Sequence, residues 1–182
     1  MILELDDYID SPTVDFIKKE IDEYKKGKVF SRYSGYNREG LTIHITPTPE
    51  LKNLDEKLSF IFTQISQSIV RLKYNPMYAV GDSGYEYHCY DPGDVCSIHT
   101  DGEIVHNSSL LRVASVVVHL NTVENGGELV FPSQNKSIKT KKGKVVIFPP
   151  YGMYKHYTTP SDEKREVLVT WFVYNGIRIS NI

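Results

Sequence analysis

The sequence predicts a mainly β protein, a double-stranded β-helix (jelly-roll) core buttressed by two N-terminal α-helices. Helical spacing of apolar residues occurs only before residue 77, and short strand patterns separated by turn residues follow it. Helices followed by many strands are typical of a double-sheet protein with helices packed on one face. We therefore expect a single domain, with helical support and a flap in residues 1–76 and the jelly-roll core in residues 77–176.

Two amphipathic helices are expected in the first segment. The first begins at Ser11-Pro12, a capping residue followed by proline, and ends at Gly27. The second follows the start signal Thr48-Pro49-Glu50 and is stopped by Asn75-Pro76. Its apolar stripe consists of Leu51, Leu54, Leu58, Ile61, Ile65, Ile69 and Leu72. A stripe of this length needs a sheet to cover, so this helix is expected to pack against the strands.

Five strands are expected after residue 77, with turn residues between them. They are Tyr85–Tyr90, Leu111–Leu120, Glu128–Phe131, Lys144–Phe148 and Glu166–Tyr174. The earlier segment Lys28–His44 has little periodicity and several positive and aromatic residues. It is either a mobile flap over the active site or an edge hairpin with a flexible tip.

Composition excludes several classes of function. The net charge is -2 with 24% charged residues spread along the chain, so no basic stripe indicates a nucleic-acid partner. No apolar run is long enough for a membrane span, and Met1–Asp7 turns acidic too soon for a secretory signal. We expect a cytoplasmic protein, with Cys89 and Cys96 as free thiols although they could face each other across a hairpin. The oligomeric state stays open.

The motif His99-Thr100-Asp101, with His156 later in the chain, carries the most chemical information. Histidine and aspartate at i and i+2 point to the same side of an extended strand. Two imidazoles and one carboxylate at one corner of a metal form the facial triad of non-haem iron(II) oxygenases. A single histidine-x-acid match is weak evidence, because chance supplies about 0.8 such matches in a chain of this composition.

Three further residues lie at positions in the sequence that could place them near this motif. Arg165 follows His156 by nine positions, and its guanidinium could bind a distant carboxylate through two parallel hydrogen bonds. Lys164 is the alternative if the strand register shifts by one residue. Tyr90 precedes His99 by nine positions and could donate a phenol to the same anion. Trp171 lies in an apolar run that core packing explains equally well.

With these elements in this order, the sequence from about Met77 to Tyr174 resembles the iron(II)- and 2-oxoglutarate-dependent dioxygenases, in their prolyl 4-hydroxylase-like branch. The resembling elements are Tyr90-x-x-Gly93, His99-x-Asp101, Leu120-Asn121, Gly126-Gly127-Glu128-x-x-Phe131-Pro132, Gly143-x-x-x-x-Phe148, His156, Arg165 and Trp171. The order and spacing of so many elements are more specific than any one of them.

The resemblance implies a role for each matching position. It makes His99, Asp101 and His156 the iron(II) ligands. Arg165 would pair with the C5 carboxylate of 2-oxoglutarate, with Tyr90 as a hydrogen-bond partner and Trp171 as an aromatic residue near the cofactor. O2 would be the second cosubstrate, ascorbate would support activity, and no catalytic residue beyond the metal ligands is required.

Two positions depart from the pattern, and the remaining histidines receive no role. Many prolyl 4-hydroxylases have a lysine where this chain has Glu166, and a tyrosine is usual where it has His119. His119 is expected to be a strand histidine with its hydrogen bonds satisfied. His88 is expected in a sheet and His44 in a strand, and His106 is expected in an exposed loop.

The activity implied is hydroxylation of a C–H bond with release of succinate and CO2. The preferred substrate is a proline-containing peptide or protein, which would make the chain a prolyl 4-hydroxylase. Two alternatives remain, a hydroxylase of a free amino acid or other small molecule and a non-catalytic jelly-roll binding module. Substrate selection is expected from Lys28–His44, from Gly102–Leu110 and from the aromatic strands.

Overall fold

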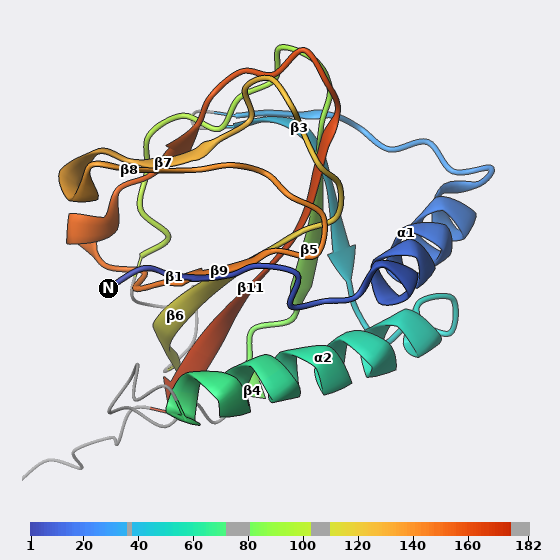
Figure 1. Cartoon of the computed structure of the whole chain (residues 1–182). Coiled ribbons are helices and arrows are strands. Elements are labelled where there is room, and N and C mark those ends of the chain that lie inside the picture. The colour runs from blue at the N-terminus through green and yellow to red at the C-terminus, as the bar shows by residue number, and fades with distance from the viewer. Residues whose placement is uncertain (36–37, 72–80, 103–109, 176–182) are drawn as a thin grey trace, which may run out of the picture.

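The computed structural model describes residues 1–35, 38–71, 81–102 and 110–175. Two helices and a set of short and long strands make up this part of the chain (Figure 1). In chain order the elements are β1 (Leu3–Leu5), α1 (Ser11–Lys25), β2 (Tyr33–Gly35), β3 (Arg38–Ile45), α2 (Lys52–Arg71), β4 (Gly81–Asp82), β5 (Tyr85–Tyr90), β6 (Leu110–His119), β7 (Leu129–Phe131), η1 (Pro132–Gln134), β8 (Lys136–Ile138), β9 (Val145–Phe148), η2 (Gly152–Tyr154), β10 (Tyr157–Thr158) and β11 (Arg165–Asn175).

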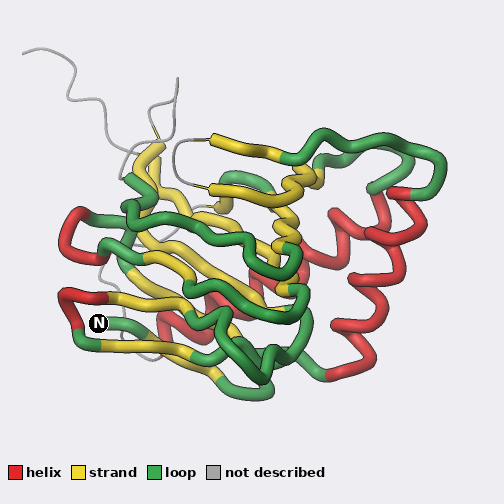
Figure 2. Tube along the Cα trace, turned by 90° about the horizontal axis from the view of Figure 1, so that it is seen from above, coloured by secondary structure: helices red, strands yellow, loops and turns green. Residues whose placement is uncertain are grey.

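The strands form a large and a small antiparallel sheet. The large sheet has the order β1-β9-β6-β11-β5-β3-β2, with β4 paired to β11, and the small sheet has the order β10-β7-β8. Both long helices lie on one side of the large sheet, and β7 and β8 lie on the other (Figure 1); Figure 2 shows the helices side by side next to the strands. The predicted mainly β fold with helical support on one face is confirmed.

Side chains alternate between two cores along the central strands β5, β6 and β11. Tyr87, Val116 and Leu168 point toward the helices and join a cluster with the buried residues of α1 and α2. Val117 and Val167 point the other way and pack with residues of the small sheet. Each central strand therefore anchors the helices with one face and leaves its other face for the space beneath the small sheet.

The first helix begins as predicted, but its cap is Asp10 and not Ser11. The amide of Thr13 donates to Asp10 Oδ1 at 2.7 Å, which satisfies one of the free N–H groups of the first turn. The second helix begins at Lys52, after a turn in which the amide of Leu51 donates to Thr48 O. Its predicted stop, Asn75-Pro76, lies outside the described residues.

The first 76 residues also contribute strands to the large sheet; a strand at His44 and an edge hairpin were among the expectations, whereas β1 was not. β1 pairs with β9, and β3 pairs with β5 from Leu41 to Ile45. The segment Lys28–His44 contains the hairpin of β2 and β3 at the edge of the sheet, with residues 36–37 outside the described part. Of its two interpretations the edge hairpin is the one observed, because alternating Leu41, Ile43 and Ile45 pack one face of β3 toward the helices.

All five predicted strands are present, with bounds within two residues of those expected. Cys89 and Cys96 are free thiols, as predicted. They cannot meet across a hairpin because Cys89 belongs to the helix-side cluster and Cys96 to the cluster beneath the small sheet. No helix within the described ranges has the length and apolar character needed to cross a membrane.

Gly126 permits a close approach of two chain segments. Its φ is +76°, and a Cβ at this position would lie 2.0 Å from the carbonyl oxygen of Pro160. Gly27 has a similar φ of +70° but open space around it, which makes it a matched control. We expect Gly126→Ala to lower the free energy of unfolding by about 3 kcal/mol or more and Gly27→Ala by about 1 kcal/mol, as measured by urea denaturation. Equal losses would contradict the close packing at Gly126.

Candidate metal centre

Reciprocal backbone pairing places two histidines side by side. The amide of His99 donates to His156 O at 3.0 Å, and the amide of His156 donates to His99 O at 2.9 Å. Nearby, the amide of Thr158 donates to Cys96 O and the amide of Cys96 donates to Thr158 Oγ1, both at 2.9 Å. Directly opposed residues of an antiparallel pair project their side chains to the same face. The two imidazole centroids are accordingly only 4.3 Å apart.

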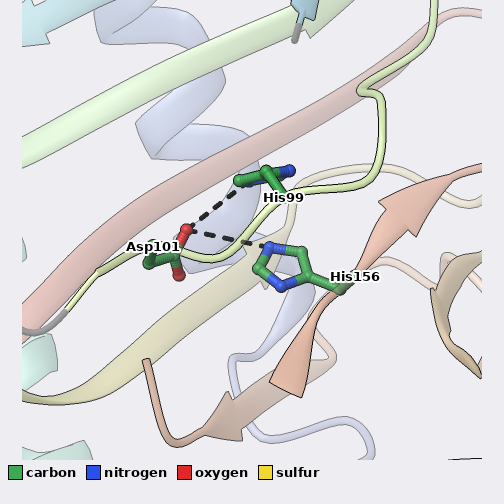
Figure 3. A group of neighbouring side chains, drawn as sticks. All are labelled: His99, Asp101 and His156. Atoms are coloured by element: carbon green, nitrogen blue, oxygen red, sulfur yellow. Dashed lines mark ion pairs between the residues drawn. The ribbon is translucent and has the colours of Figure 1, made fainter. Parts of the chain in front are cut away.

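Asp101 completes a group of three potential metal ligands (Figure 3). Its Oδ1 lies 3.5 Å from His99 Nε2 and 3.7 Å from His156 Nε2. All three potential donor atoms lie within 4.8 Å of one another. The predicted motif residues thus converge on one point from two segments far apart in sequence.

The donor atoms fit a first-row transition metal. His99 Nδ1 lies 2.8 Å from Ser97 O, and His156 Nδ1 lies 3.0 Å from Tyr154 O. A carbonyl can only accept, so each ring carries a proton on Nδ1, and the Nε2 atom that faces Asp101 is the one left for a metal. Adjacent ligands of an octahedral ion are about 3 Å apart. The two distances from Asp101 Oδ1 to the imidazole nitrogens exceed that spacing by about 0.5 to 0.7 Å.

Two residues of β6 hold Asp101, and the sequence analysis missed both. Ser115 donates its hydroxyl to Asp101 Oδ2, and Arg112 donates to the backbone carbonyl of Asp101. A bulge opposite Phe172 and Val173 shifts the register of β6 and turns Arg112 toward the site, where its guanidinium carbon lies 4.0 Å from the centroid of the Trp171 ring. A serine within a buried valine-rich strand was the available signal for Ser115.

The charges of the three side chains are arranged for cation binding. Burial lowers the pKa of His99, but hydrogen bonds to Asp101 and Cys96 outweigh it and raise that pKa to about 10. Burial raises the pKa of Asp101. The hydrogen bond with His99 and the electrostatic effect of His156 outweigh burial and hold this pKa well below its usual range. Burial lowers the pKa of His156. At neutral pH the site therefore contains one carboxylate, one neutral imidazole and one proton on His99 that a metal would displace.

Arg165 lies at the other end of the same cavity. It is 4% exposed and pairs in register with Tyr90, whose ring centroid is 5.1 Å from the guanidinium carbon. Its Nε donates to Thr140 Oγ1 at 3.2 Å. Within the described residues no carboxylate forms an ion pair with this guanidinium. A buried cation without an acidic partner is a binding site for an anion.

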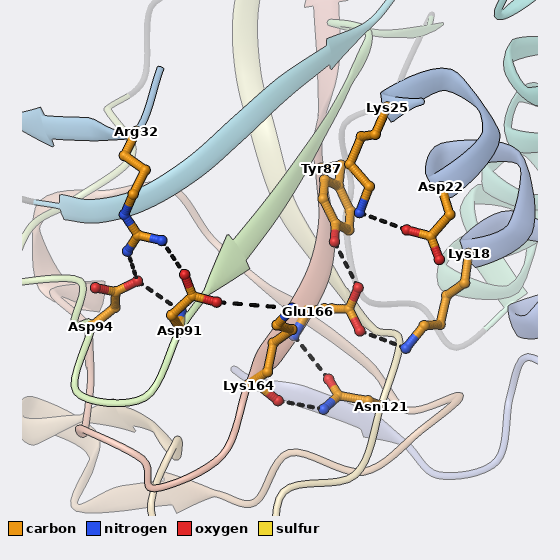
Figure 4. A network of polar contacts seen from close by, with 10 residues as sticks. All are labelled: Lys18, Asp22, Lys25, Arg32, Tyr87, Asp91, Asp94, Asn121, Lys164 and Glu166. Atoms are coloured by element: carbon orange, nitrogen blue, oxygen red, sulfur yellow. Dashed lines mark hydrogen bonds and ion pairs between the residues drawn. The ribbon is translucent and has the colours of Figure 1, made fainter. Parts of the chain in front are cut away.

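The neighbours of Arg165 point to the opposite side of β11 (Figure 4). Glu166 accepts a hydrogen bond from the Tyr87 phenol and forms an ion pair with Lys18 on the helix side. Burial, and then neighbouring groups that include Glu166, raise the pKa of the Tyr87 phenol. The Lys164 side chain is 58% exposed and lies near Asp91. The register thus directs Arg165, and not the alternative Lys164, into the cavity.

The cavity between these two ends has a volume of about 470 Å³, including its open mouth. Its apolar wall consists of Val117, Leu129, Phe148, Val167 and Val169. Tyr90, His88 and Trp171 also line it, so His88 is both the sheet residue predicted and part of the cavity wall. The predicted substrate loop Gly102–Leu110, with His106, lies outside the described residues except at its two ends.

Comparison with protein families gives one match. The model of the 2OG-Fe(II) oxygenase superfamily matches residues 85–173, which contain all three candidate metal ligands and Arg165. Over these residues, just under half of the chain, the sequence is similar to this superfamily. Curated protein sequences give no match.

Solved structures of prolyl hydroxylases have the same fold as this chain. A viral collagen prolyl hydroxylase from Paramecium Bursaria Chlorella virus-1, in complex with 2OG, has a TM-score of 0.72 at 19% identity, over 94% of this chain and 95% of that one. A prolyl-4-hydroxylase of Pseudomonas putida has a TM-score of 0.69 at 18% identity, over 96% and 93%. A Trichoplax adhaerens prolyl hydroxylase, in complex with a hypoxia inducible factor oxygen degradation domain peptide fragment, has a TM-score of 0.73 at 14% identity, over 96% and 83%. These likenesses establish the fold.

Metal binding is expected to release a proton. His99 is protonated below a pKa of about 10, whereas His156 and Asp101 already have their metal-binding forms at neutral pH. The affinity for Mn(II) should therefore rise about tenfold per pH unit between about pH 6.5 and 8.5. Calorimetry in buffers of different ionisation enthalpy measures the released proton directly. His44→Gln, which alters an exposed histidine, should keep this slope, and a flat profile would mean that His99 is neutral.

The hydroxyl of Ser115 should matter for metal affinity. Ser115→Ala leaves Asp101 Oδ2 without its donor and frees the carboxylate to rotate, so the affinity for Mn(II) should fall at least about tenfold. Ser137→Ala, on the exposed side of β8, is the matched control and should bind as the parent does. If Ser115→Ala bound metal normally, the hydroxyl would serve packing alone.

Proposed function

We propose that the protein is an iron(II)- and 2-oxoglutarate-dependent dioxygenase that hydroxylates proline in a peptide or protein. One observation carries the proposal. A three-ligand metal site and a buried guanidinium without an acidic partner lie at two ends of one cavity. A five-carbon dicarboxylate with a keto group beside one carboxylate has the two functional ends that such a cavity would bind.

The metal end would be held by His99, Asp101 and His156 through their Nε2 and Oδ1 atoms. Three protein ligands on one side leave the remaining positions for exchangeable ligands. Iron(II), when bound with 2-oxoglutarate and O2, supplies the oxidising power for C–H hydroxylation, with release of succinate and CO2. The chain itself needs no nucleophile or general base for this reaction, and ascorbate would support repeated turnover by keeping the iron reduced.

Arg165 would hold the distal carboxylate of 2-oxoglutarate. Thr140 accepts from Nε and Tyr90 also hydrogen-bonds to the guanidinium, so part of its five N–H donors remains for a contact with a carboxylate. Tyr90 faces the same guanidinium from the neighbouring strand. The apolar residues between the two ends exclude water, which strengthens the electrostatic contacts made inside the cavity.

A peptide substrate is supported by the rim of the cavity beside the metal site. Arg112 stacks over Trp171 there and is fixed by its bond to the carbonyl of Asp101. Its Nε and the indole Nε1 of Trp171 are buried without a hydrogen-bond partner in the described structure. Two unpaired donors beside an aromatic face suit a peptide carbonyl and a proline ring. The peptide seen in the Trichoplax relative is consistent with this assignment.

The proposal is tested by supplying the protein with iron(II), 2-oxoglutarate, ascorbate and air. A proline-rich peptide should gain one oxygen atom by mass spectrometry with release of an equal amount of succinate. The same peptide with alanine for proline should not react, and Asp101→Ala should abolish the reaction. Arg165→Lys should raise KM for 2-oxoglutarate at least about tenfold, because a lysine cannot copy the bidentate contact, whereas Lys164→Ala should not.

Each other outcome points to a different function. Coupled turnover of free amino acids but not of peptides would replace the peptide substrate with a small molecule. Metal-loaded protein that binds no 2-oxoglutarate and forms no succinate would leave only a non-catalytic binding module on the same scaffold.

A further inference from the structure

His119 is a wholly buried histidine without a hydrogen-bond partner. It is 0% exposed, and within the described structure neither of its ring nitrogens has a partner. The expectation that this strand histidine is satisfied is therefore wrong. A neutral imidazole contains one N–H donor and one acceptor, and leaving both unpaired in the interior destabilises the fold. Such a group calls for an explanation outside the ligand-free structure.

Strand register places His119 on the face of the sheet that carries the cavity. It pairs with Val167 on β11, and Val167 and Val117 both line the cavity. Side chains two residues apart on a strand share a face, so Arg165 is the diagonal neighbour of His119 on that face. Such diagonal neighbours are about 7–8 Å apart, within reach of a guanidinium.

The backbone on both sides of His119 is fixed. Its amide donates to Lys144 O, and its carbonyl accepts from the amide of Gly143, both at 2.9 Å. The next amide, that of Leu120, donates to Glu166 O at 2.9 Å. His119 does not line the open cavity, but the strand register and the effect of the Arg165 charge on the pKa of His119 indicate that its ring lies near that guanidinium.

The charges around His119 favour an incoming anion. Burial, then the charges of Arg165 and Lys144, lower the pKa of His119 well below its usual value, so the ring is neutral. Lys144, which directly precedes β9, is already paired with Glu4 and Asp6, at 3.3 and 3.2 Å. Arg165 has no such partner among the described residues. The uncompensated positive charge at this end of the cavity is therefore that of Arg165, and the neutral ring beside it can donate without repelling it.

We propose that His119 is a second donor for the distal carboxylate of 2-oxoglutarate, beside Arg165. A carboxylate has about four acceptor sites, and a bidentate contact with Arg165 fills only two of them. The N–H of His119 supplies a further hydrogen bond from the neighbouring strand. This inference rests on the proposed function, because it assumes that Arg165 binds this cosubstrate.

The role of His119 is tested by ligand binding in the absence of O2. Trp171 is the only tryptophan and lines the cavity, so its fluorescence in the Mn(II)-loaded protein reports binding without turnover. The probes are 2-oxoglutarate and 2-oxovalerate, which has a methyl group in place of the distal carboxylate. His119→Phe should raise the Kd of 2-oxoglutarate at least about tenfold, the loss of a hydrogen bond to a charged group, and leave that of 2-oxovalerate unchanged. His119→Tyr, which restores a donor, should recover most of the affinity.

The stability of the ligand-free protein distinguishes a role of His119 in ligand binding from a role in packing. His119→Phe removes two unpaired buried nitrogens, so Tm should rise or stay constant while affinity falls. Unchanged affinity for 2-oxoglutarate, or equal weakening of both probes, would overturn the assignment. A parent protein that binds both probes equally would instead overturn the proposed function, since Arg165 would then recognise no distal carboxylate. If His119→Phe does not fold, the comparison is made between His119→Gln, which keeps an N–H donor, and His119→Leu, which has none.

Discussion

The site depends on one short piece of antiparallel pairing, the reciprocal hydrogen bonds between the backbones of His99 and His156. The segments joined here are separated by more than fifty residues, which include β6, β7, β8 and β9. Because the two residues are directly opposed, their rings need no side-chain contact to lie together. Asp101 follows on the same strand and needs only the i, i+2 alternation to reach them. A shift of this pairing by one residue would turn one imidazole away and leave no three-ligand site.

At the other end of the cavity, the alternation of side chains along β11 determines which residue faces the interior. Lys164, Arg165 and Glu166 are three consecutive charged residues, and only the middle one enters the interior on the cavity side. The Asn121 side chain fixes this choice, because it accepts from the amide of Glu166 at 2.8 Å and donates to Lys164 O at 2.6 Å. Glu166 is then used on the helix side, paired with Lys18. The glutamate that departs from the family pattern thus has a structural role on the opposite face.

Much of this arrangement could be predicted from the sequence because it depends on local rules. The helix patterns, the five longer strands and the glycine pair Gly126-Gly127 follow from periodicity and from backbone conformation, and the metal motif follows from residue type and spacing. The short strands β1, β4, β8 and β10 could not be predicted, since two or three residues have no periodicity of their own. The role of Arg112 depends on a bulge in β6, and a bulge changes which residues face the site without leaving a clear sequence signal.

Unpaired buried polar atoms are concentrated around the cavity. In the described part of the chain they belong to Arg112, His119, Trp171 and Gln134, and the first three share the cavity face of β6 and β11. Elsewhere the two sheets satisfy their polar groups, as folded proteins generally do. Each unpaired donor lowers the stability of the ligand-free fold, so a sequence selected for stability alone would replace it. Their location on one face of two adjacent strands is where the proposed 2-oxoglutarate and peptide ligands would supply hydrogen-bond partners.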